Sequence, residues 1–245
     1  PYFKKSEDHF SGASEMHGAN GEWRVEKQRL SWKILDSFRQ AAAEVGIPSI
    51  DDFNTGDNEG FSYFQVNQKK GKRWSSASGF LHPIAHRPNL TIITCAHVDR
   101  LHIENKRVLG VAFDIQGVPT YARANKEVIL SAGAVVSPVI LQRSGIGDPD
   151  LLKQHNIDLV HKLPGVGENL QDHLQVRAVF KVKNADTLNE QANSWLGKAK
   201  MAFDYAFFRR GPLSMAPSQL GGFAKSDKQY DTANLEYHIQ PLSCE

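Results

Sequence analysis

The sequence has little cysteine, no long apolar run and no large excess of either charge, and each shortage excludes a class of protein. Two cysteines among 245 residues cannot form a disulfide framework, which favours a reducing compartment. No apolar stretch approaches the roughly 20 residues that a membrane-spanning helix needs. The 29 basic and 27 acidic residues leave a net charge of +2, which is too small to argue for a nucleic-acid partner.

The chain does contain enough apolar material for a folded core. Hydrophobic residues make up 40% of the sequence and charged residues 23%, which excludes a disordered tail. At roughly 150 residues per domain, the length fits one or two domains. The chain starts at Pro1 without an initiator methionine or a signal peptide and stops abruptly at Glu245, so we expect an internal piece of a longer protein.

Residues 1–88 are expected to form a loop-rich region with one helix. The sequence up to Arg29 is polar and shows no periodicity. Apolar residues then recur at helical spacing over residues 29–45, and Gly46 follows as a helix stop. Residues 50–71 are predicted to be an aromatic-rich loop, of a kind that usually packs over another part of the protein or has a function. A short helix is expected before Pro83.

Residues 89–163 are expected to form the next region, in which a β-meander leads into one buried strand. The expected strands are a hairpin at residues 98–103 and 108–114, with others at 90–95 and 120–124 and a buried one at 128–130. Small residues follow, and then a helix that starts at Pro138 with Ser137 as its N-cap. A buried strand, a small-residue turn and a helix in this order are what a nucleotide site requires, although an ordinary junction fits the same spacing.

Residues 164–245 predict a second region, with an antiparallel sheet and one long helix. Strands are expected at residues 174–183, 221–224 and 235–239, and the helix at 190–209. An apolar stripe on this helix includes Trp195, Phe203 and Phe207 and lies among basic residues. We expect this stripe to pack in the core, with a membrane surface as the alternative.

Several familiar catalytic motifs are missing from the sequence. The ten histidines form no set with metal-ligand spacing, so we predict no metal ligands and expect exposed or hydrogen-bonded surface histidines. Gly165 and Gly167 lack the third glycine of a dinucleotide-binding fingerprint. No G-x-S-x-G nucleophile elbow is present, which argues against a serine hydrolase of that type.

A run of small and apolar residues from Gly133 to Gly147, GAVVSPVILQRSGIG, resembles the second signature of the glucose–methanol–choline (GMC) oxidoreductases. Residues 127–133, EVILSAG, and 163–173, LPGVGENLQDH, resemble the same family in the same order. The resemblance covers essentially the whole chain and is nearest to bacterial alcohol and choline dehydrogenase-like members. It implies a fold of the α/β plus α+β class: part of a Rossmann-like FAD-binding domain with a β-meander over residues 89–163, then the start of an antiparallel-sheet substrate domain.

The resemblance also implies an FAD-dependent oxidoreductase that acts on the CH–OH group of a primary alcohol by hydride transfer to the flavin. Val98 matches the residue whose main chain meets the adenine, and Ala132 and Gly133 match the small turn beside the dinucleotide. The family's glycine-rich phosphate loop and its C-terminal catalytic histidine match nothing in this sequence. We therefore assign no catalytic residue and expect the isolated chain to be inactive and to bind FAD weakly.

Gln219 marks a departure from the choline-handling members. Those relatives resemble Glu-x-Gly-Gly-Phe at this point, with the glutamate facing a quaternary ammonium, whereas this chain has Gln219-Leu-Gly-Gly-Phe223. A neutral amide supplies no counter-charge, so we predict Gln219 as a substrate-binding residue for a neutral alcohol. Oxygen or a quinone is the expected electron acceptor, and the cytoplasm the expected location, with peripheral contact to the inner membrane left open. A non-catalytic truncated chain and an FAD-containing lyase of the same fold remain as alternatives.

Overall fold

The computed structural model describes residues 1–243 and divides the chain into two units, which are treated separately below. Unit 1 comprises Pro1–Leu90 and Ala178–Glu245, and unit 2 comprises Thr91–Arg177. Cys244 lies outside the described residues, and Cys95 is exposed and free. Within residues 1–243, every helix is too short or too polar to cross a bilayer.

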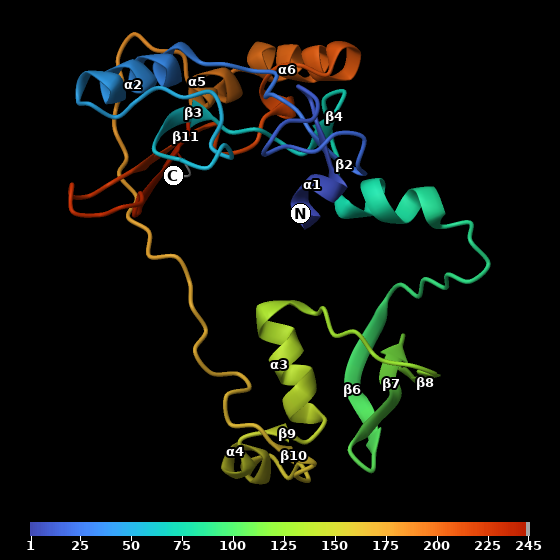
Figure 1. Ribbon diagram of the computed structural model, residues 1–245. Helices are drawn as coiled ribbons and strands as arrows, with labels where there is room; N and C mark the ends of the chain where they lie inside the picture. The colour runs from blue at the N-terminus through green and yellow to red at the C-terminus, as the bar shows by residue number, and fades with distance from the viewer. Residues whose placement is uncertain (244–245) are drawn as a thin grey trace. The chain divides into compact units, whose positions relative to one another are not determined.

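The centre of unit 1 is a three-stranded antiparallel sheet in the order β12–β11–β3 (Figure 1). Its strands are β3 (Gly60–Tyr63), β11 (Leu220–Ala224) and β12 (Leu235–Ile239). The strands predicted at residues 221–224 and 235–239 are confirmed. The prediction of an uninterrupted loop over residues 50–71 is wrong, because β3 is too short to show a period and forms only by pairing with the distant β11.

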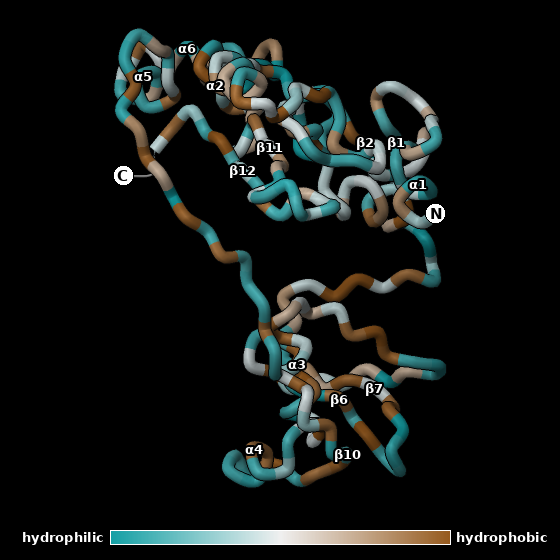
Figure 2. Tube along the Cα trace, turned by 60° about the vertical axis from the view of Figure 1, so that its left-hand side comes forward, coloured by the Kyte–Doolittle hydropathy of each residue, from teal (hydrophilic) through white to brown (hydrophobic). Residues whose placement is uncertain are grey.

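One face of this sheet is covered by helices. Helix α2 (Lys33–Glu44) and helix α5 (Leu188–Asn193) lie on the same side of β3 and β11 (Figures 1 and 2). Phe61 of β3, Leu220 of β11 and Leu35 of α2 are buried together there and form the core. The helix predicted over residues 29–45 is confirmed as α2, and Gly46 follows it with a φ of +92°, as a helix stop requires.

The N-terminal part of unit 1 is more ordered than the sequence indicates. It contains α1 (Tyr2–Ser6), a parallel pair of β1 (Glu7–His9) with β2 (Trp23–Val25), and a hairpin of β4 (Gln68–Lys69) with β5 (Lys72–Arg73). The expectation of loop up to Arg29 is therefore wrong, because elements of two to five residues are too short to carry a periodic signal.

Two short helices follow these strands. The π-helix η1 (Ala77–Leu81) leads directly into the 3₁₀-helix η2 (His82–Ile84). The short helix predicted to end before Pro83 is confirmed as η1, which ends at Leu81, and Pro83 lies in the first turn of the separate helix η2. A proline is tolerated there because the first turn of a helix leaves its N–H groups unpaired in any case.

The helix predicted over residues 190–209 is broken into α5 and α6 (Trp195–Phe208). Ser194 separates them, and its hydroxyl accepts a hydrogen bond from the Gly197 N–H at 3.0 Å, which makes it the N-cap of α6. The 3₁₀-helix η3 (Pro212–Ser214) comes after the end of α6. The expected core packing of the apolar stripe is wrong, since Trp195 is 77% exposed and Phe207 71%.

Unit 2 is built around the predicted β-meander. Strands β6 (Ala96–Glu104), β7 (Arg107–Ile115) and β8 (Val118–Arg123) pair in that order, which confirms the hairpin and the third strand. The other elements are α3 (Gly133–Arg143), β9 (Ile146–Gly147), α4 (Pro149–Gln154) and β10 (His161–Lys162), with β9 parallel to β10.

Several strands expected in and beside unit 2 do not form. Residues 90–95 and 128–130 are not strands, and Ile129 is 81% exposed. Residues 174–183 alternate between hydrophobic and hydrophilic positions, as Figure 2 shows between β10 and α5, yet they are also extended without pairing. The reason is the same in each case: none of the strands within residues 1–243 pairs with them, and alternation produces a strand only where a neighbour accepts its hydrogen bonds.

Helix α3 begins before the predicted start at Pro138. Its first residue is Gly133, and Pro138 lies inside it. The Ser137 hydroxyl accepts a hydrogen bond from the Ala132 N–H at 3.0 Å, so this serine secures the start of α3 from within the helix rather than acting as the predicted N-cap. The small residues of the turn therefore form the beginning of α3 itself.

Candidate functional site

The face of the unit 1 sheet opposite the helices carries polar and aromatic residues. Because side chains alternate along strands, residues two positions apart and their cross-strand partners share this face. We call it the aromatic face; it consists of Ser62, Phe64, Gln219, Gly221, Phe223 and His238.

Gln219 is the most unusual member of the aromatic face. The residue is 0% exposed, and its main-chain carbonyl accepts hydrogen bonds from the Phe64 N–H at 2.9 Å and from Gln28 Nε2 at 2.8 Å. Its side-chain amide oxygen and nitrogen are both buried without a hydrogen-bond partner. Each such group costs about 1–3 kcal/mol, so a buried amide with two unpaired atoms is a feature that binding of a polar ligand would explain.

Aromatic rings pack closely on this face because a glycine makes room for them. A Cβ atom at Gly221 would collide with the Phe64 ring, so only glycine allows Phe64 to lie against the strand. Phe64 also lies 5.4 Å from the His238 ring, between ring centres. Phe53, from the loop before β3, contacts Phe64 at 5.4 Å and the edge of Phe223 at 5.1 Å.

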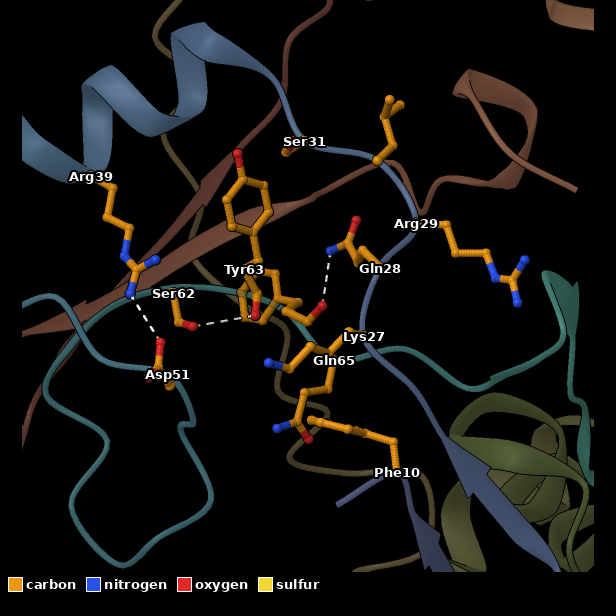
Figure 3. A pocket seen from close by; sticks show the side chains of 12 residues that line it. Phe10, Lys27, Gln28, Arg29, Ser31, Arg39, Asp51, Ser62, Tyr63 and Gln65 are labelled. Carbon is orange, nitrogen blue, oxygen red and sulfur yellow. Dashed lines mark hydrogen bonds and ion pairs between the residues drawn. The ribbon is translucent and has the colours of Figure 1, made fainter. Parts of the chain in front are cut away.

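A pocket of about 380 Å³ adjoins this face, and both Ser62 and Phe64 line it (Figure 3). Figure 3 shows Arg39 pointing to Asp51, with their atoms 3.4 Å apart, and Gln28 pointing to the Phe64 carbonyl at 2.9 Å. This volume lies within the range of small-molecule sites.

Tyr63 is also on the pocket wall, and its phenol stays protonated. Burial and a 2.8 Å hydrogen bond donated to the Asp36 carboxylate raise its pKa to about 12. The phenol is therefore neutral at physiological pH.

A buried histidine ties the loop that bears Phe53 to the N-terminal strand. His17 Nε2 lies 2.8 Å from Asp52 Oδ2, and Nδ1 lies 3.1 Å from Glu7 Oε1. His17 is only 6% exposed. We call the three residues the clasp. A neutral imidazole carries one N–H, so only the protonated ring can donate to both carboxylates.

The pKa values of the clasp follow from these contacts. Burial opposes a charge on His17, but the hydrogen bonds and charges of Glu7 and Asp52 outweigh it and raise the pKa of His17 above 6.5. Burial would likewise raise the pKa of Asp52, yet the Asn54 N–H and His17 stabilise the carboxylate and lower its pKa below 3.8. The pair therefore favours an imidazolium–carboxylate contact.

The clasp has a second histidine beside it, but the geometry does not converge on a metal. Ligand atoms of Glu7, His9 and His17 all lie within 4.8 Å of one another. The two rings are stacked at 3.9 Å with planes 16° apart, so their nitrogen lone pairs run parallel instead of meeting at one point. His9 binds Ser11 and Gln65 instead. We interpret the cluster as a hydrogen-bonded network.

The predicted cofactor residues lie in unit 2, around β6 and α3. Val98 is in β6, next to Asp99, whose carbonyl accepts from Arg143 Nε at 3.1 Å at the C-terminal end of α3. Ala132 and Gly133 lie at the other end of this helix, about 15 Å away along its axis. Gly133 has a φ of +89°, and a Cβ there would meet nothing within 4 Å. This open, small turn fits close approach of a flat ligand to the main chain.

The sequence predicts Gln219 as a substrate-binding residue, which stays a prediction, and it does not predict the clasp. The histidines were expected on the surface, and this is wrong for His9 and His17, which are buried at 3% and 6% exposure. His17 and Asp52 are 35 residues apart, so no local pattern connects them. The available signal was an acidic pair, Asp51-Asp52, directly before an aromatic residue in an otherwise irregular loop.

Comparisons with known proteins agree with this architecture. The family model for GMC oxidoreductases matches residues 1–175. Oxygen-dependent choline dehydrogenase 1 of Chromohalobacter salexigens is 37% identical over 245 residues, which covers 99% of this chain and 44% of that protein. The chain thus spans less than half the length of the curated relatives that it matches.

Two solved structures extend the likeness to the fold. Pyridoxine 4-oxidase from Mesorbium loti is 32% identical, with a TM-score of 0.67 over 71% of this chain and 34% of that one. A formate oxidase of Aspergillus oryzae, solved in a study of mutation and FAD modification, is 26% identical, with a TM-score of 0.78 over 91% and 40%. These likenesses confirm the expected fold, that of a partial FAD-binding oxidoreductase domain, and support FAD as the cofactor. The chain belongs to the GMC oxidoreductase family.

Proposed function

We propose that the protein containing this chain is an FAD-dependent oxidoreductase that oxidises the CH–OH group of a neutral primary alcohol. Family membership supports the reaction class and the cofactor. One observation carries the substrate class: the Gln219 amide is buried and unpartnered on the aromatic face. A neutral group in this position suits a neutral hydroxyl compound better than a quaternary ammonium, because it offers no counter-charge.

The cofactor would be held through main chain rather than through charged side chains. We propose that Val98, Ala132 and Gly133 contact the dinucleotide, since the turn at Gly133 is open and small. Val135 and Ile129 beside this turn are 65% and 81% exposed, which suits an apolar ligand surface. FAD bound there would supply the hydride acceptor for the alcohol carbon.

The residues of unit 1 would bind and orient the alcohol. An amide can donate to and accept from a hydroxyl, so Gln219 can satisfy both of its unpaired atoms on one substrate. Phe53, Phe64 and Phe223 would exclude water from the same face. Glu236, a carboxylate on β12, already forms an ion pair with His238 at 3.0 Å, so it offers a weaker attraction to a cationic substrate than a free carboxylate would.

Restoring a carboxylate at position 219 is the sharpest test of the substrate class. In the full-length enzyme, Gln219→Glu is expected to raise the kcat/KM ratio of choline to its neutral carbon isostere by about 10- to 100-fold. The reason is that a hydrogen bond or contact to a charged group is worth roughly 1.5–3 kcal/mol. Steady-state kinetics with the two alcohols measures the ratio, and their equal shape removes size as a variable.

The matched control for this substitution is Gln40→Glu, on the exposed side of α2, which should leave the ratio unchanged. Choline as the preferred substrate of the unaltered enzyme would contradict the proposal. An unchanged ratio in Gln219→Glu would contradict the role of Gln219.

The remaining parts of the function are proposals of the same kind. We propose oxygen or a quinone as the electron acceptor. The truncated-chain and lyase alternatives stay open until turnover is measured. The 245-residue chain by itself is expected to bind FAD weakly, and its flavin absorbance at stoichiometric FAD measures this.

We also propose that α6 gives the protein a peripheral contact with an anionic lipid surface. Its outward side is entirely apolar and exposed, and it consists of Trp195, Leu196, Ala199, Ala202, Phe203, Ala206 and Phe207. Lys198, Lys200 and Arg210 are exposed around it, whereas Asp204, the acidic residue of α6, is turned partly inward. An apolar face with a cationic rim is the arrangement of helices that lie in a lipid interface.

Vesicle co-sedimentation of the full-length protein tests this contact. We expect binding to phosphatidylcholine vesicles that contain phosphatidylglycerol, and roughly fivefold weaker binding for each of Lys198→Gln and Lys200→Gln. Phe203→Gln with Phe207→Gln should abolish it, whereas Phe3→Gln, an exposed control, should not. If the double variant fails to fold, or if the wild-type protein is a dimer and the double variant is a monomer, then protein and not lipid covers this face of α6. Either result would overturn the lipid proposal.

A further inference from the structure

The loop that carries Phe53 is fixed at one residue by the clasp and at the next by the aromatic face. Asp52 receives the 2.8 Å contact from His17 Nε2. Its neighbour Phe53 contacts Phe64 and Phe223. The two adjacent residues therefore join the buried N-terminal network to the sheet face that carries Gln219.

The contacts continue from Phe53 to Gln219 without a gap. The Phe64 ring, in contact with Phe53, belongs to the residue whose N–H donates to the Gln219 carbonyl at 2.9 Å. The loop is also anchored where it begins, because Arg39 Nη2 donates to the Ile50 carbonyl at 2.6 Å. Beyond Ile50 the hold is weaker, since Asp51 is almost fully exposed and its contact with Arg39 is long, at 3.4 Å. A shift of Asp52 is therefore expected to move Phe53 more readily than Phe64, which the β3–β11 pairing holds.

We propose that His17 is a positioning residue for the substrate: by binding Asp52 it holds Phe53 over the aromatic face and so sets which alcohols fit. This inference rests on the proposed function. His17 touches neither substrate nor cofactor in this scheme; it acts through Asp52 and Phe53. The groups that face it are Glu7 and His9 from β1 and Asp52 from the loop, and Gln65 bonds His9 from the opposite side.

The network is suited to this task because it is rigid and enclosed. His17 uses both ring nitrogens on carboxylates from different segments, and the stacked His9 ring restricts its rotation. Glu7 is in turn fixed by the Gly18 N–H at 2.7 Å. A Cβ at Gly18 would collide with the Lys4 main chain, so only glycine fits directly after His17.

The test compares a small and a bulky neutral alcohol in the full-length holoenzyme. His17→Gln and Asp52→Asn are expected to lower the ratio of kcat/KM for the bulky alcohol to that for the small one by roughly 10- to 100-fold, mainly through KM. Phe53→Ala, which leaves the clasp intact, should shift the ratio in the same direction. The double variant His17→Gln/Asp52→Asn should have the same ratio as the single variants, because both substitutions break the same contact.

Two further measurements separate positioning from a purely structural role. Asp57→Asn, an exposed acid in the same loop, is the matched control and should leave the ratio unchanged. The wild-type ratio should fall as the pH rises through the pKa of His17 in the folded protein, which lies above the ordinary value of 6.5, and His17→Gln should show no such change.

The results distinguish failure of the positioning role from failure of the proposed function. If the clasp variants have a lower flavin content and a lower Tm but an unchanged kcat/KM ratio of bulky to small alcohol per bound flavin, the positioning role is overturned. An unchanged ratio in Phe53→Ala would overturn it as well. Absence of turnover of any alcohol by the wild-type holoenzyme would instead overturn the proposed function. If the wild-type enzyme oxidises neutral alcohols and the clasp variants keep the wild-type kcat/KM ratio, only the present inference is overturned.

Discussion

Phe61→Ala is expected to lower the free energy of unfolding by about 3–5 kcal/mol. Phe61 is 2% exposed, in the middle of β3, and packs between α2 and β11 with Leu35 and Leu220. Phe38 and Tyr237 contact its ring at 5.6 Å and 5.5 Å. Truncation removes these contacts and leaves a cavity that β11 cannot fill, because Gly222 faces it.

Urea unfolding of the wild-type and variant proteins measures this loss. The control is Phe180→Ala, which removes an equally large ring that is 79% exposed and should change stability by no more than about 0.5 kcal/mol. A similar loss in both variants would mean that the core of unit 1 is not centred on the sheet. It would also remove the support that we assign to the aromatic face.

The second large effect is expected at the clasp. His17→Gln should destabilise the protein by about 3 kcal/mol between pH 3.8 and 6.5, because it leaves two carboxylates without their shared cation. His17 has a raised pKa, so its contribution is complete below 6.5 and is lost as the pH rises through its folded-state pKa. Asp52 has a lowered pKa, so its contribution is present above 3.8 and is lost as the pH falls through its folded-state pKa.

The difference in unfolding free energy between wild type and His17→Gln, measured across and beyond this pH range, tests how the stabilisation by the clasp depends on pH. It should be largest between the two ordinary pKa values and shrink on both sides. His102→Gln is the matched control, because His102 pairs with Glu104 at an exposed site and should contribute less than about 1 kcal/mol. A difference that grows at alkaline pH would contradict an imidazolium in the clasp.

The elements that the sequence predicts well are those with a strong local pattern. Helix α2 has apolar residues at helical spacing and a glycine stop, and both signals lie within one segment. The β6–β7 hairpin turns at Asn105 and Lys106, which both have positive φ, and residues typical of strands lie on each side of the turn. Such elements need no information from distant residues.

The features that escape prediction depend on partners far along the chain. Strand β3 exists through pairing with β11, and the clasp joins residues 35 positions apart. The segments at 128–130 and 174–183 show the converse error, since a strand-like sequence without a pairing partner forms no strand. Gln219 stands out as a candidate because a short motif, Gln219-Leu-Gly-Gly-Phe223, departs at one position from the form that the family resemblance implies, and its role in substrate binding stays a prediction.

Anaerobic reduction of the purified full-length protein tests the central claim most directly. We predict that the protein carries oxidised flavin and that its absorption band bleaches with the neutral carbon isostere of choline at far lower concentration than with choline itself. A protein purified without flavin, or one whose flavin choline reduces at the lower concentration, would contradict the account.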